Sequence, residues 1–397
     1  MNFRDSKGRD FVEKVGPTIQ GLLNGVKQTS ETFATKHNLD LQELKKVLKG
    51  QIPPSDQILK AIDNHSPLRI RDLYDLSIRD QFPVRDDTTD GIIVFSATER
   101  NKTLRTLYRG PEGEKVPYYD YADTAMSTTS LFRPEWIAER FHDSGNCAEL
   151  PDWAFNKGHF EHQLTFFIGD VNFHWIGNNG KKQVQKMTTG DMNYNTPFIP
   201  HTFTTRTVGN GLILAVTYGG SIATEGFQSK IKAMSYDTYL KHIKEEVLSL
   251  DKETTTDKLN GVIIKRVTEG ETKGRYSIRD AMENIPYQPW TKAFEYIISS
   301  SSKAQPDLKA ASDLWGYNTG DTSFVMVWGS HEQIIGPGDS FFIKQGTQYG
   351  YGNKYAKFLL IQINPVEGNP WKELAHIYSN SGEIGVRRAR EETEQWF

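Results

Sequence analysis

The stretch FNKGHFEHQLTFFIGD places His159, Glu161, His162 and Gln163 within five positions, directly before an apolar run. Imidazole nitrogens and side-chain oxygens of these kinds are ligands for divalent transition metals. The apolar run that follows is typical of a buried strand. The polar side chains therefore either hold an ion or form a polar rim on an ordinary sheet.

These residues and a later histidine could together form a metal site. Alternation along a strand would point His159, Glu161 and Gln163 to one face and His162 to the other. His201 lies 38 residues after Gln163, and its strand could lie beside the first in a small barrel. Two histidines and one oxygen donor form a facial triad with open positions, which non-heme Fe(II) uses for substrate and O2. The third ligand is then Glu161, the commoner choice chemically, or the neutral amide of Gln163.

A weak internal repeat relates the two halves of the chain. The motif IGDVNFHWIG at 168–177 resembles TGDTSFVMVWG at 319–329. Likewise, TTGDMNYNTPFIPHTF at 188–203 resembles GPGDSFFIKQGTQYGY at 336–351. These pairs indicate that one structural unit occurs twice.

Alignment on the aspartates of these motifs shows that the second copy lacks the polar side chains of the candidate site. The pairs are His159 with Ala310, Gln163 with Leu314, and His201 with Tyr349. Such a loss indicates that the positions have a function in the first copy. It favours a metal site over the alternative that the histidines are ordinary hydrogen-bonded polar residues.

The elements that would position these residues fall into four predicted domains. Residues 1–85 contain short amphipathic helices of helix-turn-helix type. Residues 86–225 contain short β-type runs separated by Gly, Asn and Asp, which predict an antiparallel barrel or jelly roll, with a helix at 132–141 before it. Residues 226–295 are predicted as a helical connector or second helical unit, and residues 296–397 as a degenerate second barrel with a C-terminal tail.

Composition excludes several classes of protein. The chain has 397 residues, of which 37% are hydrophobic and 24% charged, as expected of a globular protein. A net charge of −3 gives no general attraction to nucleic acid or anionic lipid. Residues 1–80 carry 13 basic and 11 acidic side chains, a net of only +2, so we expect no nucleic-acid partner despite the helix-turn-helix pattern.

The cellular setting is predicted from what the sequence lacks. Cys147 is the only cysteine, so no disulfide can form within the chain. The N-terminal residues lack the apolar core of a secretion signal, and no apolar run reaches the length of a membrane span. We therefore expect a cytoplasmic protein with no membrane partner, and we expect a homo-oligomer.

The pattern Asn156-x-x-His159-x-x-x-Gln163 followed by His201 resembles the signature of the phosphonate-metabolising helix-turn-helix/cupin oxygenases. This family includes hydroxypropylphosphonate epoxidase, hydroxyethylphosphonate dioxygenase and methylphosphonate synthase. The resemblance implies an α+β fold of duplicated helical and cupin β-barrel or jelly-roll units, with the second cupin degenerate. It also implies Fe(II) as the cofactor, bound by His159, Gln163 and His201.

The ligand set distinguishes the members of the family. The epoxidase has Glu at the position of Gln163, and the dioxygenase takes a Glu from the position of Asn195, six residues before His201. Methylphosphonate synthase uses two histidines and a glutamine, which this chain resembles best. The resemblance then implies cleavage of the C–C bond of 2-hydroxyethylphosphonate with O2, giving methylphosphonate and CO2 or bicarbonate. The alternatives are the dioxygenase reaction, which gives hydroxymethylphosphonate and formate, a ligand-sensing cupin-type transcription regulator, and a metal-free binding cupin.

The resemblance also implies a set of phosphonate-binding residues. Asn156 could reach an oxyanion bound to the metal, because it lies three residues before His159. In RGPEGEKVPYYDY, Arg109 and Tyr121 match the family's Arg and Tyr, although Arg105 competes with Arg109 for that role. Lys27 matches the lysine that the helical domain of a relative extends into the active site.

Overall fold

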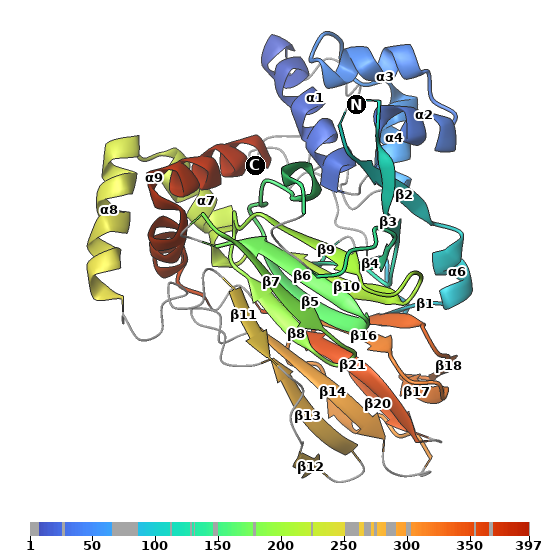
Figure 1. Cartoon of the computed structure of the whole chain (residues 1–397). Helices are drawn as coiled ribbons and strands as arrows, with labels where there is room; N and C mark the ends of the chain where they lie inside the picture. The colour runs from blue at the N-terminus through green and yellow to red at the C-terminus, as the bar shows by residue number, and fades with distance from the viewer. Residues whose placement is uncertain are drawn as a thin grey trace. The chain divides into compact units, whose positions relative to one another are not determined.

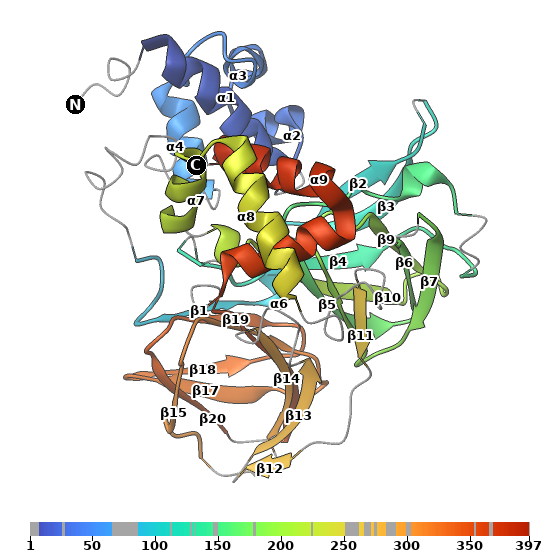
Figure 2. The same cartoon turned by 90° about the vertical axis from the view of Figure 1, so that its left-hand side faces the viewer.

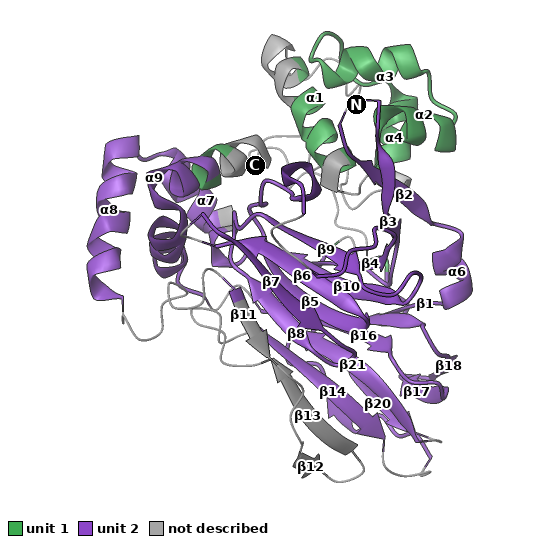
Figure 3. Cartoon of the chain, in the orientation of Figure 1, with its two compact units in different colours: residues 1–87, 127–129, 389–397 green, residues 88–126, 130–388 purple. Residues whose placement is uncertain are grey.

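The computed structural model of the chain is drawn from two sides in Figures 1 and 2. It describes residues 8–25, 28–65, 86–111, 113–127, 129–130, 132–145, 150–177, 180–223, 225–250, 262–265, 271–273, 276–282, 291–298, 303–352, 355–364 and 368–396. Contacts divide the chain into two compact units, which Figure 3 colours green and purple. Unit 1 comprises residues 1–87, 127–129 and 389–397, and unit 2 comprises residues 88–126 and 130–388.

Unit 1 is a bundle of amphipathic helices. Its helices are α1 (Gly8–Gly25), α2 (Ser30–Lys36), α3 (Leu41–Leu48) and α4 (Asp56–His65). Asp40 is the N-cap of α3. Its carboxylate accepts hydrogen bonds from the N–H groups of Gln42 at 2.7 Å and Glu43 at 3.2 Å. The apolar stripes of the helices, including Ile19 and Leu44, meet in one core.

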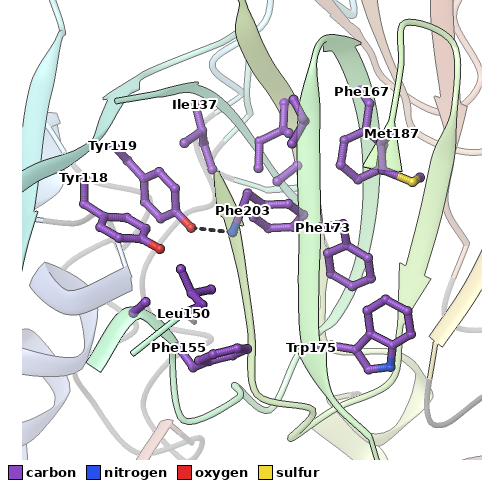
Figure 4. Close-up of a cluster of buried hydrophobic side chains, with 14 of the residues drawn as sticks. Tyr118, Tyr119, Ile137, Leu150, Phe155, Phe167, Phe173, Trp175, Met187 and Phe203 are labelled. Atoms are coloured by element: carbon purple, nitrogen blue, oxygen red, sulfur yellow. Dashed lines mark hydrogen bonds between the residues drawn. The ribbon is translucent and has the colours of Figure 1, made fainter. Parts of the chain in front are cut away.

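Unit 2 contains two jelly rolls, each built from two antiparallel sheets. In the first jelly roll, a seven-stranded sheet of order β11-β8-β5-β10-β4-β3-β2 faces a three-stranded sheet of order β7-β6-β9. Its strands are β2 (Arg105–Arg109), β3 (Val116–Ala122), β4 (Phe132–Glu139), β5 (His162–Gly169), β6 (Val171–Ile176), β7 (Lys182–Met187), β8 (Met192–Asn195), β9 (His201–Thr205), β10 (Gly211–Tyr218) and β11 (Val262–Lys265). Phe167 of β5 and Phe173 of β6 share the apolar core between the sheets, part of which is drawn in Figure 4.

The second jelly roll repeats this order of strands. A seven-stranded sheet of order β1-β19-β16-β21-β14-β13-β12 accompanies a four-stranded sheet of order β15-β20-β17-β18. Its strands are β1 (Ile92–Phe95), β12 (Glu271–Lys273), β13 (Tyr276–Met282), β14 (Lys292–Ile298), β15 (Leu308–Lys309), β16 (Leu314–Asn318), β17 (Phe324–Trp328), β18 (His331–Ile335), β19 (Ser340–Ile343), β20 (Gln348–Gly352) and β21 (Ala356–Gln362). The predicted α+β fold with a duplicated β unit is therefore confirmed.

The two jelly rolls exchange an edge strand. β1 precedes the first jelly roll in the chain but pairs with β19 of the second, with Ile92 opposite Ile343. β11 follows the first jelly roll and pairs with β8, with Val262 opposite Asn195. Each seven-stranded sheet is therefore completed by a strand from the other half of the chain.

Matching turns establish which residues of the two copies correspond. Asp191 accepts a hydrogen bond from Thr188 N at 2.8 Å, and Asp339 accepts one from Gly336 N at 2.7 Å. The N–H of Phe167 donates to the carbonyl of Asp191, as the N–H of Asn318 does to that of Asp339. Counting back four residues along β5 and β16 pairs Gln163 with Leu314, as the sequence repeat predicts.

Two predicted helical segments contain strands. Residues 132–141, predicted as a helix, contain strand β4, which pairs with β10 on one side and β3 on the other. Its Glu and Ala residues favour a helix locally, but pairing on both edges and burial of Ile137 outweigh that preference. The predicted connector 226–295 is helical in α7 (Glu225–Lys232) and α8 (Tyr236–Ser249) and then continues as strands from β11 onward. The four predicted domain boundaries stay a prediction.

Strand β5 is packed on both of its faces. Its even-numbered residues Leu164 and Phe166 share a core with Trp315, Leu359 and Ile361 of the second jelly roll. Its odd-numbered residues point into the first jelly roll instead. The second jelly roll therefore supports from behind the strand that carries Gln163.

The last helix, α9 (Pro370–Trp396), bends at Gly382. Gly382 has φ 62° and ψ −160°, a backbone conformation that only glycine adopts readily. Figures 1 and 2 draw the two pieces of α9 in red, meeting at an angle. None of the helices in the described ranges is long and apolar enough to cross a membrane.

Candidate metal centre

His159 and Gln163 approach one another at the start of β5. The alternation of side chains predicted that His159 lies on the strand. The strand begins at His162, however, so His159 lies in the preceding loop. The loop nevertheless brings His159 Nε2 to 3.0 Å from Gln163 Oε1. Gln163 is only 5% exposed.

His201 reaches the same place from the facing sheet. It is the first residue of β9, which pairs with β6 and not with β5. The rings of His159 and His201 lie nearly perpendicular, at 87°, with centroids 5.2 Å apart. The prediction that the histidines come together is confirmed, although their elements lie on facing sheets and not on one wall.

Backbone contacts fix which nitrogen each histidine presents. His159 Nδ1 lies 2.9 Å from the carbonyl oxygen of Glu161, and His201 Nδ1 lies 2.8 Å from that of Ile199. A carbonyl oxygen accepts only, so each Nδ1 carries the proton and donates it. Nε2 of each ring is then left with a lone pair, which is the form that binds a metal.

The Gln163 amide is oriented by a second contact. Its Nε2 donates to Thr165 Oγ1 at 2.8 Å, which turns Oε1 toward His159. A nitrogen lone pair and a carbonyl oxygen 3.0 Å apart can both bind one cation that lies beside them. The donor set therefore fits a divalent ion of the Fe(II) type.

Glu161, the other predicted third ligand, lies on the wrong side of the imidazole. Its Oε2 is 3.5 Å from His159 Nδ1, across the ring from Nε2, and its side chain is 42% exposed. Within the described ranges, no three His, Cys, Asp or Glu side chains form a group that could hold a metal. Of the two predicted third ligands, Gln163 and not Glu161 approaches His159 Nε2.

Asn156 joins the loop of His159 to the strand of His201. Its Oδ1 accepts from the N–H groups of His201 and Gly158, both at 2.9 Å. Its Nδ2 lies 3.2 Å from His201 Nε2. The amide donor therefore points at the place where a metal-bound oxyanion would lie.

Arg109 and two tyrosines surround Thr202, the residue after His201. Arg109 donates to Thr202 Oγ1 at 3.2 Å and to the carbonyl of Ala154. The hydroxyls of Tyr118 and Tyr119 each lie 2.9 Å from the same Oγ1. Figure 4 shows the two rings beside the strand of Phe203, whose N–H donates to Tyr119 Oη at 2.8 Å. Burial raises the pKa of Tyr119 to about 12, so its hydroxyl keeps its proton.

The remaining candidates contact other residues or lie outside the described residues. Tyr121 is buried and packs edge-on against Tyr119, with centroids 5.7 Å apart. Arg105 forms an ion pair with Asp123 at 2.7 Å, whereas Arg109 contacts Thr202. Lys27 lies outside the described residues.

Sequence reasoning missed Thr165 and Thr202. Thr165 lies two residues after Gln163 on the same face of β5, a spacing that could have indicated its contact with the amide. Thr202 carries no such signal, because its partners are 83 to 93 residues away in the sequence.

The second copy of the site is filled with apolar side chains. Ala310, Leu314 and Tyr349, which pair with the candidate ligands, are all buried in the core of the second jelly roll. The neighbours of Gln163 differ in the same way. Asn195 lies opposite Gln163 in the ladder of the first copy, where Ile343 lies opposite Leu314 in the second.

Comparison with known proteins identifies the family. No family model matches the sequence. The chain is 30% identical to the methylphosphonate synthase of Nitrosopumilus maritimus (strain SCM1), in an alignment that covers 99% of this chain and 97% of that protein. The chain belongs to the methylphosphonate synthase family.

Solved structures share the fold of this family member. The structure of Streptomyces albus HEPD with substrate 2-hydroxyethylphosphonate and Fe(II) bound has a TM-score of 0.61 at 20% identity, covering 97% of this chain and 98% of that one. Native PhpD with cadmium atoms has a TM-score of 0.52 at 15% identity, covering 94% and 99%. The fold of this chain is therefore similar to the folds of these two proteins.

Proposed function

We propose that this protein is an Fe(II)-dependent oxygenase that converts 2-hydroxyethylphosphonate and O2 into methylphosphonate and bicarbonate. The C–C bond of the substrate breaks, its phosphonate-bearing carbon becomes the methyl group, and its hydroxyl-bearing carbon is oxidised to bicarbonate. One substrate dianion and one O2 give one methylphosphonate dianion, one bicarbonate and one proton. The substrate supplies all the electrons, so the reaction needs no reducing cofactor.

The observation that carries the proposal is that His159 Nε2 lies 3.0 Å from Gln163 Oε1 and that the ring centroids of His159 and His201 are 5.2 Å apart, in a member of this family. The candidate ligand atoms are His159 Nε2, Gln163 Oε1 and His201 Nε2. These atoms would hold Fe(II), which supplies the point where O2 and the substrate oxygens meet. The backbone carbonyls at Nδ1 and the hydroxyl of Thr165 hold the three ligands in their orientations.

The side chains around the ligands suit a phosphonate dianion, which needs several hydrogen-bond donors. Asn156 Nδ2 would donate to a substrate oxygen at the metal. Arg109 carries a positive charge and donates to Thr202, the residue after His201. Tyr119 stays protonated and can therefore donate a hydrogen bond. Tyr121 and Lys27 are proposed as further substrate contacts from the family resemblance alone.

A second candidate is the dioxygenase reaction, which gives hydroxymethylphosphonate and formate. The likeness of the fold to HEPD favours it. Against it stands Asn195, which by the family resemblance matches the position of the dioxygenase carboxylate, and which lies opposite Gln163 in the ladder. The two reactions share substrate and metal and differ only in the product.

Phosphorus NMR of the products decides between these candidates. The protein is reconstituted with Fe(II) under anaerobic conditions and then given 2-hydroxyethylphosphonate and O2. We expect methylphosphonate and bicarbonate in equal amounts, and no turnover in the absence of Fe(II). Hydroxymethylphosphonate as the main product would establish the second candidate. If the iron-loaded protein converts no substrate and specifically retards DNA in a gel-shift assay, the protein is a regulator instead.

We also propose that the protein works in the cytoplasm as a homo-oligomer. The sequence contains one cysteine and therefore no internal disulfide, which suits a reducing compartment. Light scattering during gel filtration measures the assembly, and a mass equal to that of one chain would refute the oligomer.

A further inference from the structure

Helix α9 contacts the chain segments that hold the candidate ligands, although it follows them by about 170 to 230 positions. Its contacts come from Glu373, Asn380 and Arg388, which we name the α9 clamp. Asn380 Nδ2 lies 3.4 Å from Thr196 Oγ1, next to Asn195 and ahead of His201. The α9 clamp thus contacts residues that are next to the candidate ligands in the sequence.

Glu373 fixes the first half of α9 behind Gln163. Its buried carboxylate accepts from Ser221 N at 3.0 Å, from Ser221 Oγ at 2.7 Å and from Ile222 N at 3.3 Å. One of its oxygens also lies 3.6 Å from Nε2 of His162, the residue before Gln163. This end of the helix is therefore hydrogen-bonded to the segment after β10 and approaches the residue before Gln163.

Arg388 contacts the loop of His159 from the second half of α9. Its guanidinium donates to the carbonyl oxygens of Lys157 and Gly158, each at 3.3 Å. It also lies over the ring of Phe198, 4.3 Å from the centroid. The loop is an irregular segment without strand pairing, so its shape depends on such contacts.

The residues under Arg388 have unusual backbone conformations. Gly158 has φ 69° and approaches Phe198 so closely that a Cβ would lie 2.4 Å from its carbonyl carbon. Phe198 itself has φ 64°, which a bulky side chain adopts only where its surroundings hold it. Its N–H donates to the carbonyl of His159 at 2.8 Å. Arg388 therefore covers the point where the segments leading to both histidines cross.

The bend at Gly382 makes both ends of the clamp possible. A straight helix would continue along the direction set by Glu373. Because Gly382 turns the chain, Arg388 meets the loop while Glu373 stays behind β5. The glycine at position 382 therefore allows Arg388 to contact the loop of His159.

We propose that Arg388 is a positioning residue that holds the loop of Asn156 and His159 closed around the metal and the phosphonate. The proposal rests on the proposed function. Two charge-assisted hydrogen bonds and a cation–π contact are together large enough to change a binding constant by roughly ten- to thirtyfold. Because the loop carries one ligand and one substrate donor, opening it weakens Fe(II) binding and raises KM without slowing the saturated enzyme.

The test compares Arg388→Ala with Arg387→Ala. Arg387 is the matched control, because it precedes Arg388 on α9 but contacts Glu383 and Tyr236 instead of the loop. Hydrogen exchange of the metal-free protein measures two backbone amides. Gly158 N–H donates to Asn156 Oδ1, and Phe198 N–H donates to the carbonyl oxygen of His159. Anaerobic Fe(II) titration and steady-state kinetics with 2-hydroxyethylphosphonate give the metal Kd, KM and kcat.

For Arg388→Ala we expect faster exchange at both amides, an Fe(II) Kd and a KM each raised about tenfold, and a kcat that is little changed. Arg387→Ala should match the wild type, and Arg388→Lys, which keeps the charge but loses the fork, should lie between. Equal exchange and equal Fe(II) affinity in the two alanine variants would overturn the proposal, as would a loss confined to kcat.

Two further arms keep the test decisive. If Arg388→Ala does not fold, Arg388→Lys and Arg388→Gln carry the same comparison, because each removes the guanidinium fork and keeps most of the side chain. If the wild type binds no Fe(II) or forms no methylphosphonate, the proposed function fails. Exchange at Gly158 and Phe198 in the metal-free protein still decides whether Arg388 holds the loop.

Discussion

Replacing Thr165 with valine removes one hydroxyl and leaves the shape of the side chain unchanged. That hydroxyl accepts the amide hydrogen of Gln163 at 2.8 Å, and Thr165 is fully buried. Without it, the Gln163 amide can turn over and donate its hydrogen to His159 Nε2. The metal-free protein then regains a hydrogen bond, but the metal loses its oxygen ligand.

The two states therefore respond differently to this change. The unfolding free energy of the metal-free variant should fall by less than about 1 kcal/mol, because the turned amide is again hydrogen-bonded. Loss of a contact that orients a ligand typically weakens metal binding by about 10- to 100-fold. That factor equals roughly 1.4 to 2.8 kcal/mol of binding free energy.

The assay pairs anaerobic Fe(II) titration with denaturant unfolding of the metal-free protein. Thr124→Val serves as the control, because the buried Thr124 hydroxyl donates to the carbonyl of Pro134, away from the ligands. Thr165→Val should lose iron affinity, and Thr124→Val should not. Wild-type iron affinity in Thr165→Val, or an equal loss in both variants, would refute the role given to the Gln163 amide.

Three further predictions concern the ligand charge, the pH response and the support of β5. Gln163→Glu places a negative charge on the metal and should divert product from methylphosphonate toward hydroxymethylphosphonate, whereas an unchanged yield and rate in phosphorus NMR would exclude a role for ligand charge. Burial lowers the pKa of His174 to about 4, although the carboxylate of Asp143 acts to raise it. The unfolded state therefore binds a proton at a higher pH than the folded state, and the unfolding free energy falls as pH drops from about 6.5 to 4. His174→Gln should reduce this dependence of the unfolding free energy on pH, as measured by denaturant unfolding at a series of pH values. Trp315→Ala opens a cavity behind β5 and should cost about 3 to 5 kcal/mol of unfolding free energy, and a loss under about 1 kcal/mol would contradict the tight packing between the jelly rolls.

Local sequence patterns were sufficient for part of this structure. The short β-type runs, the aspartate turns and the repeat all depend on residues close in the chain, and they predicted the duplicated jelly roll and paired Gln163 with Leu314. His159, Gln163 and His201 were found because their types are chemically distinctive. Their roles as iron ligands remain a proposal that the geometry supports.

Long-range contacts account for what the sequence did not reveal. Residues 132–141 have a helical composition, and only pairing with β3 and β10 makes β4 a strand. Alternation of His159 with Gln163 would require β5 to begin before His159, whereas the strand begins at His162. The return of α9 to the loop of His159 joins positions about 230 residues apart, a distance at which periodicity carries no information.

The exchange of β1 and β11 makes the two halves of the chain mutually dependent for folding. A fragment that ends after the first jelly roll would leave the edge of β8 unpaired, and the remaining fragment would lack the partner of β19. Deleting the second jelly roll would therefore remove part of the backbone hydrogen bonding of the first. A duplicated gene could lose the chemistry of one half by ordinary substitution and still be unable to discard its fold.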